Sequence, residues 1–476
     1  MAHPSHEPAL PLGVNLAGYL DATAGVGEAA RHLHEALRAA GVAVAPLTLR
    51  SRDAPREGTP ASSGAGGEAH PEAVHPVTIV CANPDGMTGA RDELGPTAFE
   101  GRHVVGMWWW EVAALPQRWL RAFDLVDEVW VGSRFVADLL AAVSPVPVVH
   151  VPLAVPEPLA AAAGRAQLGL PEGFLFGFVF DYASVAGRKN PLGLVEAFAR
   201  AFPAAADDGP SLVLKTLGGE RFAREHAEVL AAAATHPRVT VLDRHLPAAE
   251  KNALIRELDC YVSLHRSEGF GLTIAEAMLL GTPVIATDYG GTRDLLTAFN
   301  SLLVDHRLAP IGPGHEPYPE HGEWAEPDLD QAAALMRAAH ADPEAGRARA
   351  RRARADVLAR HRPPAAGRVM ADRLARVLTL PHDGRGRPAA ADLEGVRERM
   401  ATGPKAAPGA DRGPRGAVRD AALRAMRPYT VHQRLVDQEL LRALQTIDER
   451  VRGLAAGQQA LAAELARLRR EVEEGH

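Results

Sequence analysis

Short apolar runs alternate with amphipathic segments along the N-terminal third of the chain. Six of the runs have the length and the β-branched content of buried strands: GVNLAGYL, VAVAPLTL, PVTIVCAN, RHVVGMWWW, DEVWVGS and VPVVHVPL. Helical patterns begin near Gly27 and at Arg134 between these runs. Strands that alternate with helices in this way are typical of a parallel sheet with crossover helices. We therefore expect residues 1–160 to form a doubly wound α/β domain.

A segment rich in proline and alanine, PLAVPEPLAAAAG at positions 152–164, interrupts this alternation. The same pattern then starts again with six more strand-like runs: FLFGFVF, SLVLKTL, RVTVLD, DCYVSL, TPVIATD and SLLVD. We therefore expect residues 165–380 to form a second doubly wound α/β domain. Sheets of this kind bind ligands beyond the C-terminal ends of their strands, so two such domains facing each other predict a ligand-binding cleft.

The C-terminal part of the chain has a different pattern. Residues 381–420 are rich in Gly, Pro, Ala and Arg, which predicts a flexible basic linker, and residues 421–476 are expected to form a helical tail. Apolar residues from Leu440 to Val472 recur at spacings of four and three, with one polar position at Gln458, as in the seam of a coiled coil. This predicts a homo-oligomer or a partner protein bound through residues 440–472. A lone amphipathic helix folded back on the rest of the chain is the alternative.

Composition changes this picture little. Of the 476 residues, 47% are apolar and 23% are charged, as in a globular protein, and the net charge of -7 gives no sign of nucleic-acid binding. Cys81 and Cys260 each lie in an apolar strand-like run, which favours buried thiols in a reducing compartment. The N-terminus lacks a basic region followed by an apolar stretch, and no run approaches about 18 apolar residues, so we expect a cytoplasmic protein. Residues 51–75 are polar and of low complexity, and we assign them no function.

The strongest candidate site is a glycine turn in the stretch SEGFGLTIAEAM. A strand-like run ends just before it, the backbone turns through Gly269, Phe270 and Gly271, and a helical pattern begins near Thr273. Backbone N–H groups of such a turn and of a helix N-terminus form an anion site, and glycine lets the backbone approach a ligand closely. The turn therefore predicts a binding site for a diphosphate.

Two carboxylates flank this turn, Glu268 and Glu276. A carboxylate next to a phosphate is repulsive, so these side chains are better suited to accept hydrogen bonds from uncharged hydroxyl groups of a ligand. Each has a structural alternative. Thr273 and Glu276 have the spacing of a helix capping box, and the alternative for Glu268 is a solvated loop acid.

Two adjacent cations, Arg188 and Lys189, occur in the stretch GRKNP between a strand-like run and a helical pattern. At the C-terminal end of a strand they can neutralise a leaving diphosphate. The alternative is a solvated surface pair.

Other motifs are weaker. Gly25 and Gly27 match the spacing of a dinucleotide fingerprint, but the strand before them ends several residues too early, so a glycine-rich loop at the cleft is the better interpretation. Of the three tryptophans at positions 108–110, at least one belongs to a core, and the others either stack on a sugar ring or pack between domains. Asp328 and Asp330 form a literal Asp-x-Asp, but they lie where a helix is expected to begin, so we expect no metal site.

Together these residues resemble the retaining glycosyltransferases of family 4, whose fold is named GT-B. The segment EGFGLTIAE, residues 268–276, reproduces the Glu-x7-Glu motif of that family and is followed by AMLLGTPVIATDYGGTRD. Similarity to a mannosyltransferase-like subgroup of bacterial surface polysaccharide synthesis rests on GVGEAAR, WWE, DEVWVGSRFVADLL, RKNP and GEWAEPD. The resemblance covers roughly residues 13–375 and does not reach the tail. It implies an α/β fold with two Rossmann-like domains facing a cleft.

The resemblance implies a role for each candidate residue. Glu276 would bind ribose hydroxyls of a nucleotide-sugar, Glu268 would contact the donor sugar, and Lys189 with Arg188 would hold the diphosphate. Many relatives have an arginine where this chain has Ser184. Because this second cation is missing, Arg188 is expected to take a larger part in holding the diphosphate. The remaining donor-binding residues would be Gly25, Gly27, Gly269, Phe270, Gly271, Leu272 and Thr273. On the acceptor side we expect Glu111, where many relatives have a histidine, and Trp110.

The implied activity is that of a retaining hexosyltransferase, with mannose from GDP-mannose as the favoured donor and a surface polysaccharide or glycolipid as the acceptor. In the front-face mechanism of such enzymes the leaving diphosphate helps to take the acceptor proton, and neither a metal nor a cofactor beyond the donor is required. The alternative is an inactive GT-B scaffold that recruits polysaccharide-synthesis enzymes through its coiled coil. Residues 347–362 are rich in arginine, which suits either contact with anionic lipid at the inner face of the membrane or a solvated helix face.

Overall fold

The computed structural model describes residues 12–21, 25–50, 73–204 and 209–379. The expected linker and coiled-coil tail lie outside the described residues, as does most of the low-complexity segment 51–75.

The first sheet has six parallel strands in the order β2-β1-β3-β4-β5-β6. In chain order the strands are β1 Gly13–Gly18, β2 Ala43–Thr48, β3 Val77–Cys81, β4 His103–Trp108, β5 Glu128–Val131 and β6 Val148–His150. The associated helices are α1 Gly25–Ala39, α2 Pro84–Leu94, α3 Arg134–Ala141 and the 3₁₀ segments η1 Pro96–Ala98 and η2 Gln117–Leu125. All six strands occur where the sequence pattern predicts them.

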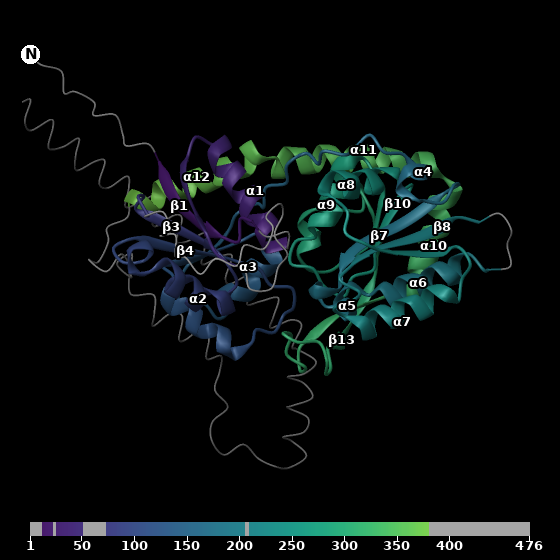
Figure 1. Ribbon diagram of the computed structural model, residues 1–476, viewed down its shortest axis with the longest axis horizontal. Helices are drawn as coiled ribbons and strands as arrows, with labels where there is room; N and C mark the ends of the chain where they lie inside the picture. Colours follow the sequence, from purple (N-terminus) through teal and green to yellow (C-terminus); the bar gives the residue numbers. More distant parts are fainter. Residues whose placement is uncertain (1–11, 22–24, 51–72, 205–208, 380–476) are drawn as a thin grey trace, which may run out of the picture. The chain divides into compact units, whose positions relative to one another are not determined.

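Both faces of the first sheet are buried, which explains why its strands are almost continuously apolar. Side chains of one face, such as Leu16 and Ile79, pack with α1, whereas the alternating residues Ala17 and Val80 pack with α2 and η2. Figure 1 shows α1 and α2 on the two sides of β1, β3 and β4.

The second sheet also has six parallel strands, in the order β12-β11-β10-β7-β8-β9. Its strands are β7 Leu175–Asp181, β8 Ser211–Leu217, β9 Val239–Asp243, β10 Cys260–Ser263, β11 Val284–Thr287 and β12 Leu302–Val304. Its helices are α4 Arg165–Leu168, α5 Ala186–Lys189, α6 Pro191–Ala201, α7 Ala223–Ala234, α8 Ala248–Glu257, α9 Leu272–Leu280 and α10 Leu329–Ala341, with the 3₁₀ segments η3 Tyr182–Ser184 and η4 Gly290–Asp294. These strands too match the predicted runs, and their order brings the C-terminal ends of β7 and β10 side by side.

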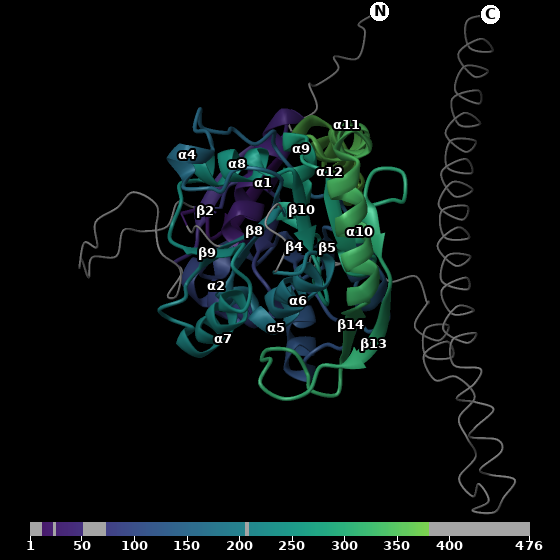
Figure 2. The same ribbon diagram turned by 90° about the vertical axis from the view of Figure 1, so that its right-hand side faces the viewer.

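An antiparallel hairpin that the sequence pattern did not predict follows β12. It consists of β13 His306–Pro310 and β14 Glu323–Pro327, paired from His306 with Pro327 to Pro310 with Glu323 (Figure 2). Its apolar residues Ile311, Tyr318 and Trp324 are buried in the core cluster that includes Trp110 and Trp119 of the first domain. The hairpin therefore joins a segment of the second half to the first domain.

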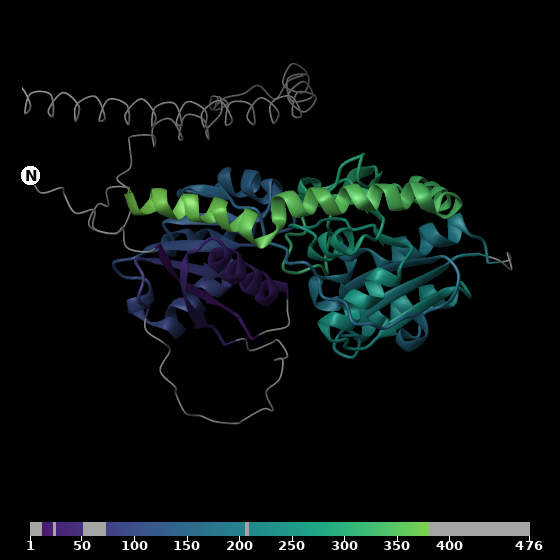
Figure 3. The ribbon, with the colours of Figure 1, turned by 90° about the horizontal axis from the view of Figure 1, so that it is seen from above.

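The last two described helices, α11 Pro343–His361 and α12 Pro363–Thr379, follow each other in a row and are green in Figure 3. The first packs against α9 of the second half, whereas α12 packs on α1, and its residues Met370 and Leu374 belong to a core cluster of the first domain. The expected domain of residues 165–380 thus ends in a helix that packs on the other domain.

A buried ion pair holds α12 in place. The Nε atom of Arg373 lies 3.1 Å from Oε2 of the fully buried Glu128, whose Oε1 accepts a hydrogen bond of 2.6 Å from the indole N–H of Trp130. Removal of the guanidinium would leave a buried carboxylate without its cation.

Both cysteines are buried and free, as the sequence predicts. Among the described residues, no helix is long and apolar enough to cross a membrane.

Candidate functional site

The glycine turn lies between β10 and α9, as predicted. Gly271 has a φ of 90° and precedes Leu272, the first residue of α9, so the turn requires a conformation that favours glycine. A Cβ atom on Gly269 would lie 2.6 Å from the backbone oxygen of Trp110 in the first domain. Phe270 is buried and packs edge-on against His361. The turn is therefore shaped both by its own backbone and by the close approach of the first domain.

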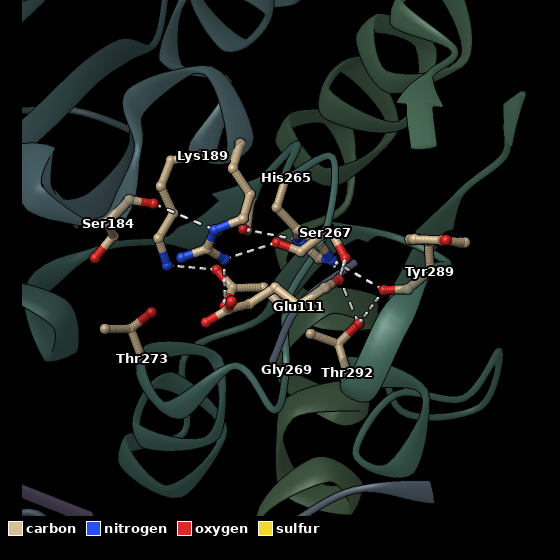
Figure 4. Close-up of polar contacts among 12 residues, drawn as sticks. Glu111, Ser184, Lys189, His265, Ser267, Gly269, Thr273, Tyr289 and Thr292 are labelled. Carbon is tan, nitrogen blue, oxygen red and sulfur yellow. Dashed lines mark hydrogen bonds and ion pairs between the residues drawn. The ribbon is translucent and has the colours of Figure 1, made fainter. Parts of the chain in front are cut away.

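Glu268 lies between the two predicted cations, Arg188 and Lys189, the second of which is labelled in Figure 4. Its Oε1 is 2.5 Å from Nζ of Lys189, its Oε2 is 3.0 Å from Nη1 of Arg188, and its backbone oxygen accepts a hydrogen bond of 2.7 Å from the N–H of Gly291. Burial alone would raise the pKa of Glu268, but the charges of Arg188 and Lys189 outweigh it and hold that pKa well below its usual value. With only 9% of its surface exposed, Glu268 is not the solvated loop acid of the alternative interpretation.

Arg188 and Lys189 end the short helix α5, and their surroundings differ. Arg188 donates from Nη1 to the backbone oxygen of Ser267 at 2.8 Å and from Nε to that of Ser184 at 3.2 Å. Its side chain is 4% exposed, whereas that of Lys189 is 14% exposed. Neither is a solvated surface cation. Because the guanidinium of Arg188 already bonds to two backbone oxygens and to Glu268, Lys189 is the better placed of the two to bind a ligand.

Beneath the turn, His265 is fully buried. Its Nε2 lies 3.2 Å from the backbone oxygen of Tyr289, and its Nδ1 lies 3.0 Å from Oγ of Ser263. Since a carbonyl oxygen can only accept, Nε2 carries the proton and Nδ1 accepts from Ser263. Burial lowers the pKa of His265 to about 4, so the ring is neutral near pH 7.

Glu276 lies in the second turn of α9 and is held by a residue that the sequence did not reveal. Nζ of Lys251, on α8, donates to both carboxylate oxygens of Glu276 at 2.8 and 2.9 Å. Burial, together with the nearby charge of Glu28, raises the pKa of Glu276. The capping-box alternative does not apply, because α9 has no side-chain cap and the hydroxyl of Thr273 instead accepts a hydrogen bond of 3.0 Å from Tyr261.

The first two of the candidate glycines, Gly25 and Gly27, lie in the first turn of α1. A Cβ atom on Gly25 would meet no atom within 4 Å, so this glycine borders open space. The effect of Glu28 on the pKa of Glu276 is the sign that this end of α1 is near the site. Their role at the donor phosphates stays a prediction.

Glu111 follows β4 and reaches the site from the first domain. Its Oε2 accepts a hydrogen bond of 3.0 Å from the hydroxyl of Tyr318, and its backbone oxygen accepts one from Oγ of Ser267. Trp110 does not reach a ligand: it is 2% exposed, packs on Trp119, and donates from its indole N–H to the backbone oxygen of Ala114. Of the two interpretations of this tryptophan, packing between domains holds and stacking on a sugar does not.

No group of three metal-ligating side chains occurs within the described residues. The Asp-x-Asp pair begins a helix, as expected. The carboxylate of Asp328 accepts hydrogen bonds of 3.0 and 2.9 Å from the backbone N–H groups of Asp330 and Gln331, and so caps α10.

Comparison with known proteins finds a family match for the segment that contains this site. Residues 183–309, which include the cations, the glycine turn and both glutamates, match the family described as Glycosyl transferases group 1. The chain is 32% identical over 121 residues to the lipopolysaccharide core biosynthesis mannosyltransferase LpsB of Rhizobium meliloti, over 25% of this chain and 34% of the relative. It is 30% identical over 193 residues to the D-inositol 3-phosphate glycosyltransferase of Streptomyces scabiei, over 38% and 40% of the two chains. The chain thus spans less than half the length of either relative.

Solved structures agree on the fold. The sucrose-phosphate synthase of Thermosynechococcus elongatus matches with a TM-score of 0.55 and 20% identity, over 77% of this chain and 99% of the other. The HepE protein of Anabaena in complex with UDP and glucose matches with a TM-score of 0.55 and 15% identity, over 77% and 100%. At these identities the matches support the two-domain arrangement of parallel sheets and no more.

Proposed function

We propose that the protein is a retaining glycosyltransferase that moves a hexose from a nucleotide-sugar to a glycan or glycolipid acceptor without a metal ion. The observation that carries this proposal is the placement of Glu268 against Lys189 and Arg188, directly before the glycine turn that opens α9. Cations, free helix N–H groups and carboxylate acceptors then lie in one place, which is the set of groups that a sugar diphosphate requires.

Each part of the donor has a matching group. The N–H groups of Gly271 to Thr273 and the ammonium of Lys189 would hold the diphosphate, and Glu268 would accept a hydrogen bond from a hydroxyl of the transferred sugar. Glu276 would bind the ribose hydroxyls, one helical turn further along α9. The ion pair with Lys251 preorganises the carboxylate of Glu276, because the lysine fixes its orientation before a ligand binds.

The acceptor would approach from the first domain, where the half-buried Glu111 would accept a hydrogen bond from the attacking hydroxyl. In a front-face displacement the acceptor oxygen bonds to the anomeric carbon on the face that the diphosphate leaves, and the acceptor proton passes to a departing phosphate oxygen. The protein then has to position both substrates and to stabilise the leaving charge, and Lys189 suits the second task.

The donor and acceptor classes rest on the relatives. The name of the first relative, a lipopolysaccharide core biosynthesis mannosyltransferase, supports mannose as the transferred hexose and a surface glycan as the acceptor. GDP as the nucleotide of the donor follows from the family resemblance. The HepE structure with UDP and glucose keeps UDP-glucose as a second donor to be tested.

The test is a panel of sugar nucleotides incubated with the full chain in EDTA, with hydrolysis and transfer to glycolipid extracts as readouts. We expect turnover of at least one donor, and we expect Lys189→Met to lower its rate by about 10²- to 10³-fold. Arg376→Met, an exposed cation on α12, is the matched control and should keep it. Lack of turnover with every donor, while the tail still binds partner proteins, would favour the inactive scaffold.

A contact with anionic lipid is proposed for α11. Exposed arginines line this helix, and although Arg347 and Arg351 pair with Glu344, Arg352 lies over the exposed ring of Phe299 at 6.0 Å. Cations beside an exposed aromatic ring suit the headgroup region of an anionic bilayer. Sedimentation with phosphatidylglycerol vesicles but not with phosphatidylcholine vesicles would support this contact, and sedimentation with neither would exclude it.

A further inference from the structure

We propose that Tyr318 is a positioning residue that fixes the carboxylate of Glu111 for the acceptor hydroxyl. This inference rests on the proposed function and deepens it, because it assigns part of the acceptor side to the hairpin β13–β14. Tyr318 lies on the segment that joins the two strands of this hairpin, 207 residues beyond Glu111 in the sequence.

The two carboxylate oxygens of Glu111 differ in their hydrogen bonding. Oε2 accepts the hydrogen bond of 3.0 Å from the hydroxyl of Tyr318. Within the described part of the chain, no donor is hydrogen-bonded to Oε1, and Glu111 is only half buried. The backbone of Glu111 is held separately, since its carbonyl oxygen accepts from Oγ of Ser267. Main chain and one carboxylate oxygen are therefore fixed, and the second oxygen is left for a ligand.

The charges of the site favour the same arrangement. Burial raises the pKa of Tyr318, and the neighbouring Glu111 raises it further despite the charge of Arg188, so the phenol stays protonated and acts as a donor. Arg188 in turn is close enough to Glu268 and Glu111 for both carboxylates to favour its charged form. The carboxylate that Tyr318 holds thus lies near the cation that pairs with Glu268.

The ring and the hydroxyl of Tyr318 have separable roles. The ring is buried and packs on Trp110, with 5.1 Å between the ring centroids, which is a structural contact. Only the hydroxyl reaches Glu111. Tyr318→Phe keeps the ring and removes the hydrogen bond, so it distinguishes positioning from packing.

The experiment measures steady-state hydrolysis of UDP-glucose and GDP-mannose, with water as the acceptor, for the wild type, Tyr318→Phe, Glu111→Gln and the double variant. For the donor that the wild type hydrolyses, we expect Tyr318→Phe to lower kcat by about tenfold to a hundredfold, the range for a lost hydrogen bond to a charged group, while the donor KM changes by less than about twofold. The double variant should be no slower than Glu111→Gln, because the hydroxyl acts only through that carboxylate.

A matched control is Thr282→Val, between α9 and β11, which removes one buried hydroxyl hydrogen bond, of 2.9 Å to the backbone oxygen of Ile255. It should lower the melting temperature about as much as Tyr318→Phe does and leave kcat unchanged. A kcat of Tyr318→Phe equal to that of the wild type, or multiplicative losses in the double variant, would overturn the positioning role and leave the proposed function in place. Lack of turnover of every sugar nucleotide in the panel by the wild type would instead contradict the proposed function and this inference with it.

Discussion

The two glutamates that flank the glycine turn are eight residues apart and differ in almost every physical respect. Glu268 precedes α9 and is paired with two cations, whereas Glu276 lies inside α9 and is paired with Lys251 alone. Their pKa values move in opposite directions. Burial would raise both, but for Glu268 the cations Arg188 and Lys189 outweigh it, and for Glu276 burial and Glu28 outweigh Lys251.

The difference shows that a symmetrical sequence motif can hold two unlike groups. Glu268 remains anionic at any ordinary pH and fixes the positions of two cations that a diphosphate would otherwise have to order. Glu276 belongs to a lysine–carboxylate pair with little net charge, which suits the recognition of uncharged hydroxyls. In the proposed function these groups contact different parts of one donor, and the following changes test that division.

The largest expected effect is on stability. Glu268→Ala would leave Arg188 and Lys189 buried without their common anion, so the free energy of unfolding should fall by about 3 to 5 kcal/mol. Glu276→Ala removes the partner of a single, less buried lysine and should cost less. Urea denaturation of both variants, with the exposed Glu35→Ala on α1 as control, measures the difference. Equal losses of unfolding free energy in the two variants would contradict the expectation that pairing with two cations makes Glu268 the more stabilising glutamate.

Next in size is the effect of Lys189→Met on catalysis. In the proposed function this ammonium faces the leaving diphosphate, so its loss should lower kcat by about 10²- to 10³-fold, as for other preorganised groups that stabilise a developing anion. Steady-state transfer or hydrolysis with the best donor of the panel measures it, beside Arg376→Met. A fall in kcat of less than about fivefold would remove Lys189 from the reaction centre.

Lys251→Met should have a smaller effect, and only on donor binding. The methionine keeps the length of the side chain but leaves Glu276 without its partner, so nucleotide-sugar affinity should fall by about tenfold, as for a single charge-assisted hydrogen bond. Calorimetric titration gives the Kd, and kcat at saturating donor should stay near that of the wild type. A large loss of kcat with unchanged Kd would place Lys251 in a different role.

The smallest effect is the pH dependence of stability, which has opposite signs for the two glutamates. Because the folded-state pKa of Glu268 is lowered, its contribution is present above its unfolded pKa of about 4.3 and is lost as the pH falls below it. The raised pKa of Glu276 makes its contribution greatest below about 4.3, and that contribution is lost as the pH rises.

Urea unfolding between pH 3 and 7 compares these slopes. Glu268→Gln should flatten the rise of stability with pH below about 4.3, and Glu276→Gln should steepen the rise above it. Each unit by which a pKa differs between the folded and the unfolded state changes the free energy of unfolding by about 1.4 kcal/mol. Identical profiles for both variants and the wild type would contradict the assigned pKa directions.

Local patterns in the sequence were sufficient for the twelve strands of the two sheets and for the glycine turn. Strand period, glycine spacing and adjacent cations are all read within a few residues, and Glu268, Lys189 and Arg188 accordingly meet in space as expected. The same local signals could not assign Arg188 its actual partners, the backbone oxygens of Ser267 and Ser184.

Local patterns in the sequence could not predict contacts between distant segments. Lys251 meets Glu276 from a separate helix, and Tyr318 meets Glu111 from another domain, so neither pair has a fixed spacing that a sequence pattern can show. The hairpin β13–β14 was missed because its short strands, HRLAP and EWAEP, each end in proline and carry charged residues. Periodicity marks α12 as amphipathic but does not tell that its apolar face packs on α1.

The central claim is that Glu276 contacts the nucleotide while Glu268 contacts the sugar that is transferred. Titration calorimetry of UDP and of GDP against the wild type, Glu268→Gln and Glu276→Ala tests it most directly, because these ligands lack the sugar. For the nucleotide that the wild type binds, we expect Glu276→Ala to weaken binding by at least about tenfold. Glu268→Gln should weaken it by less, because glutamine keeps an oxygen that can accept from Lys189 and only the ordering of the two cations is impaired. Equal weakening by both substitutions, or a loss confined to Glu268→Gln, would contradict the account.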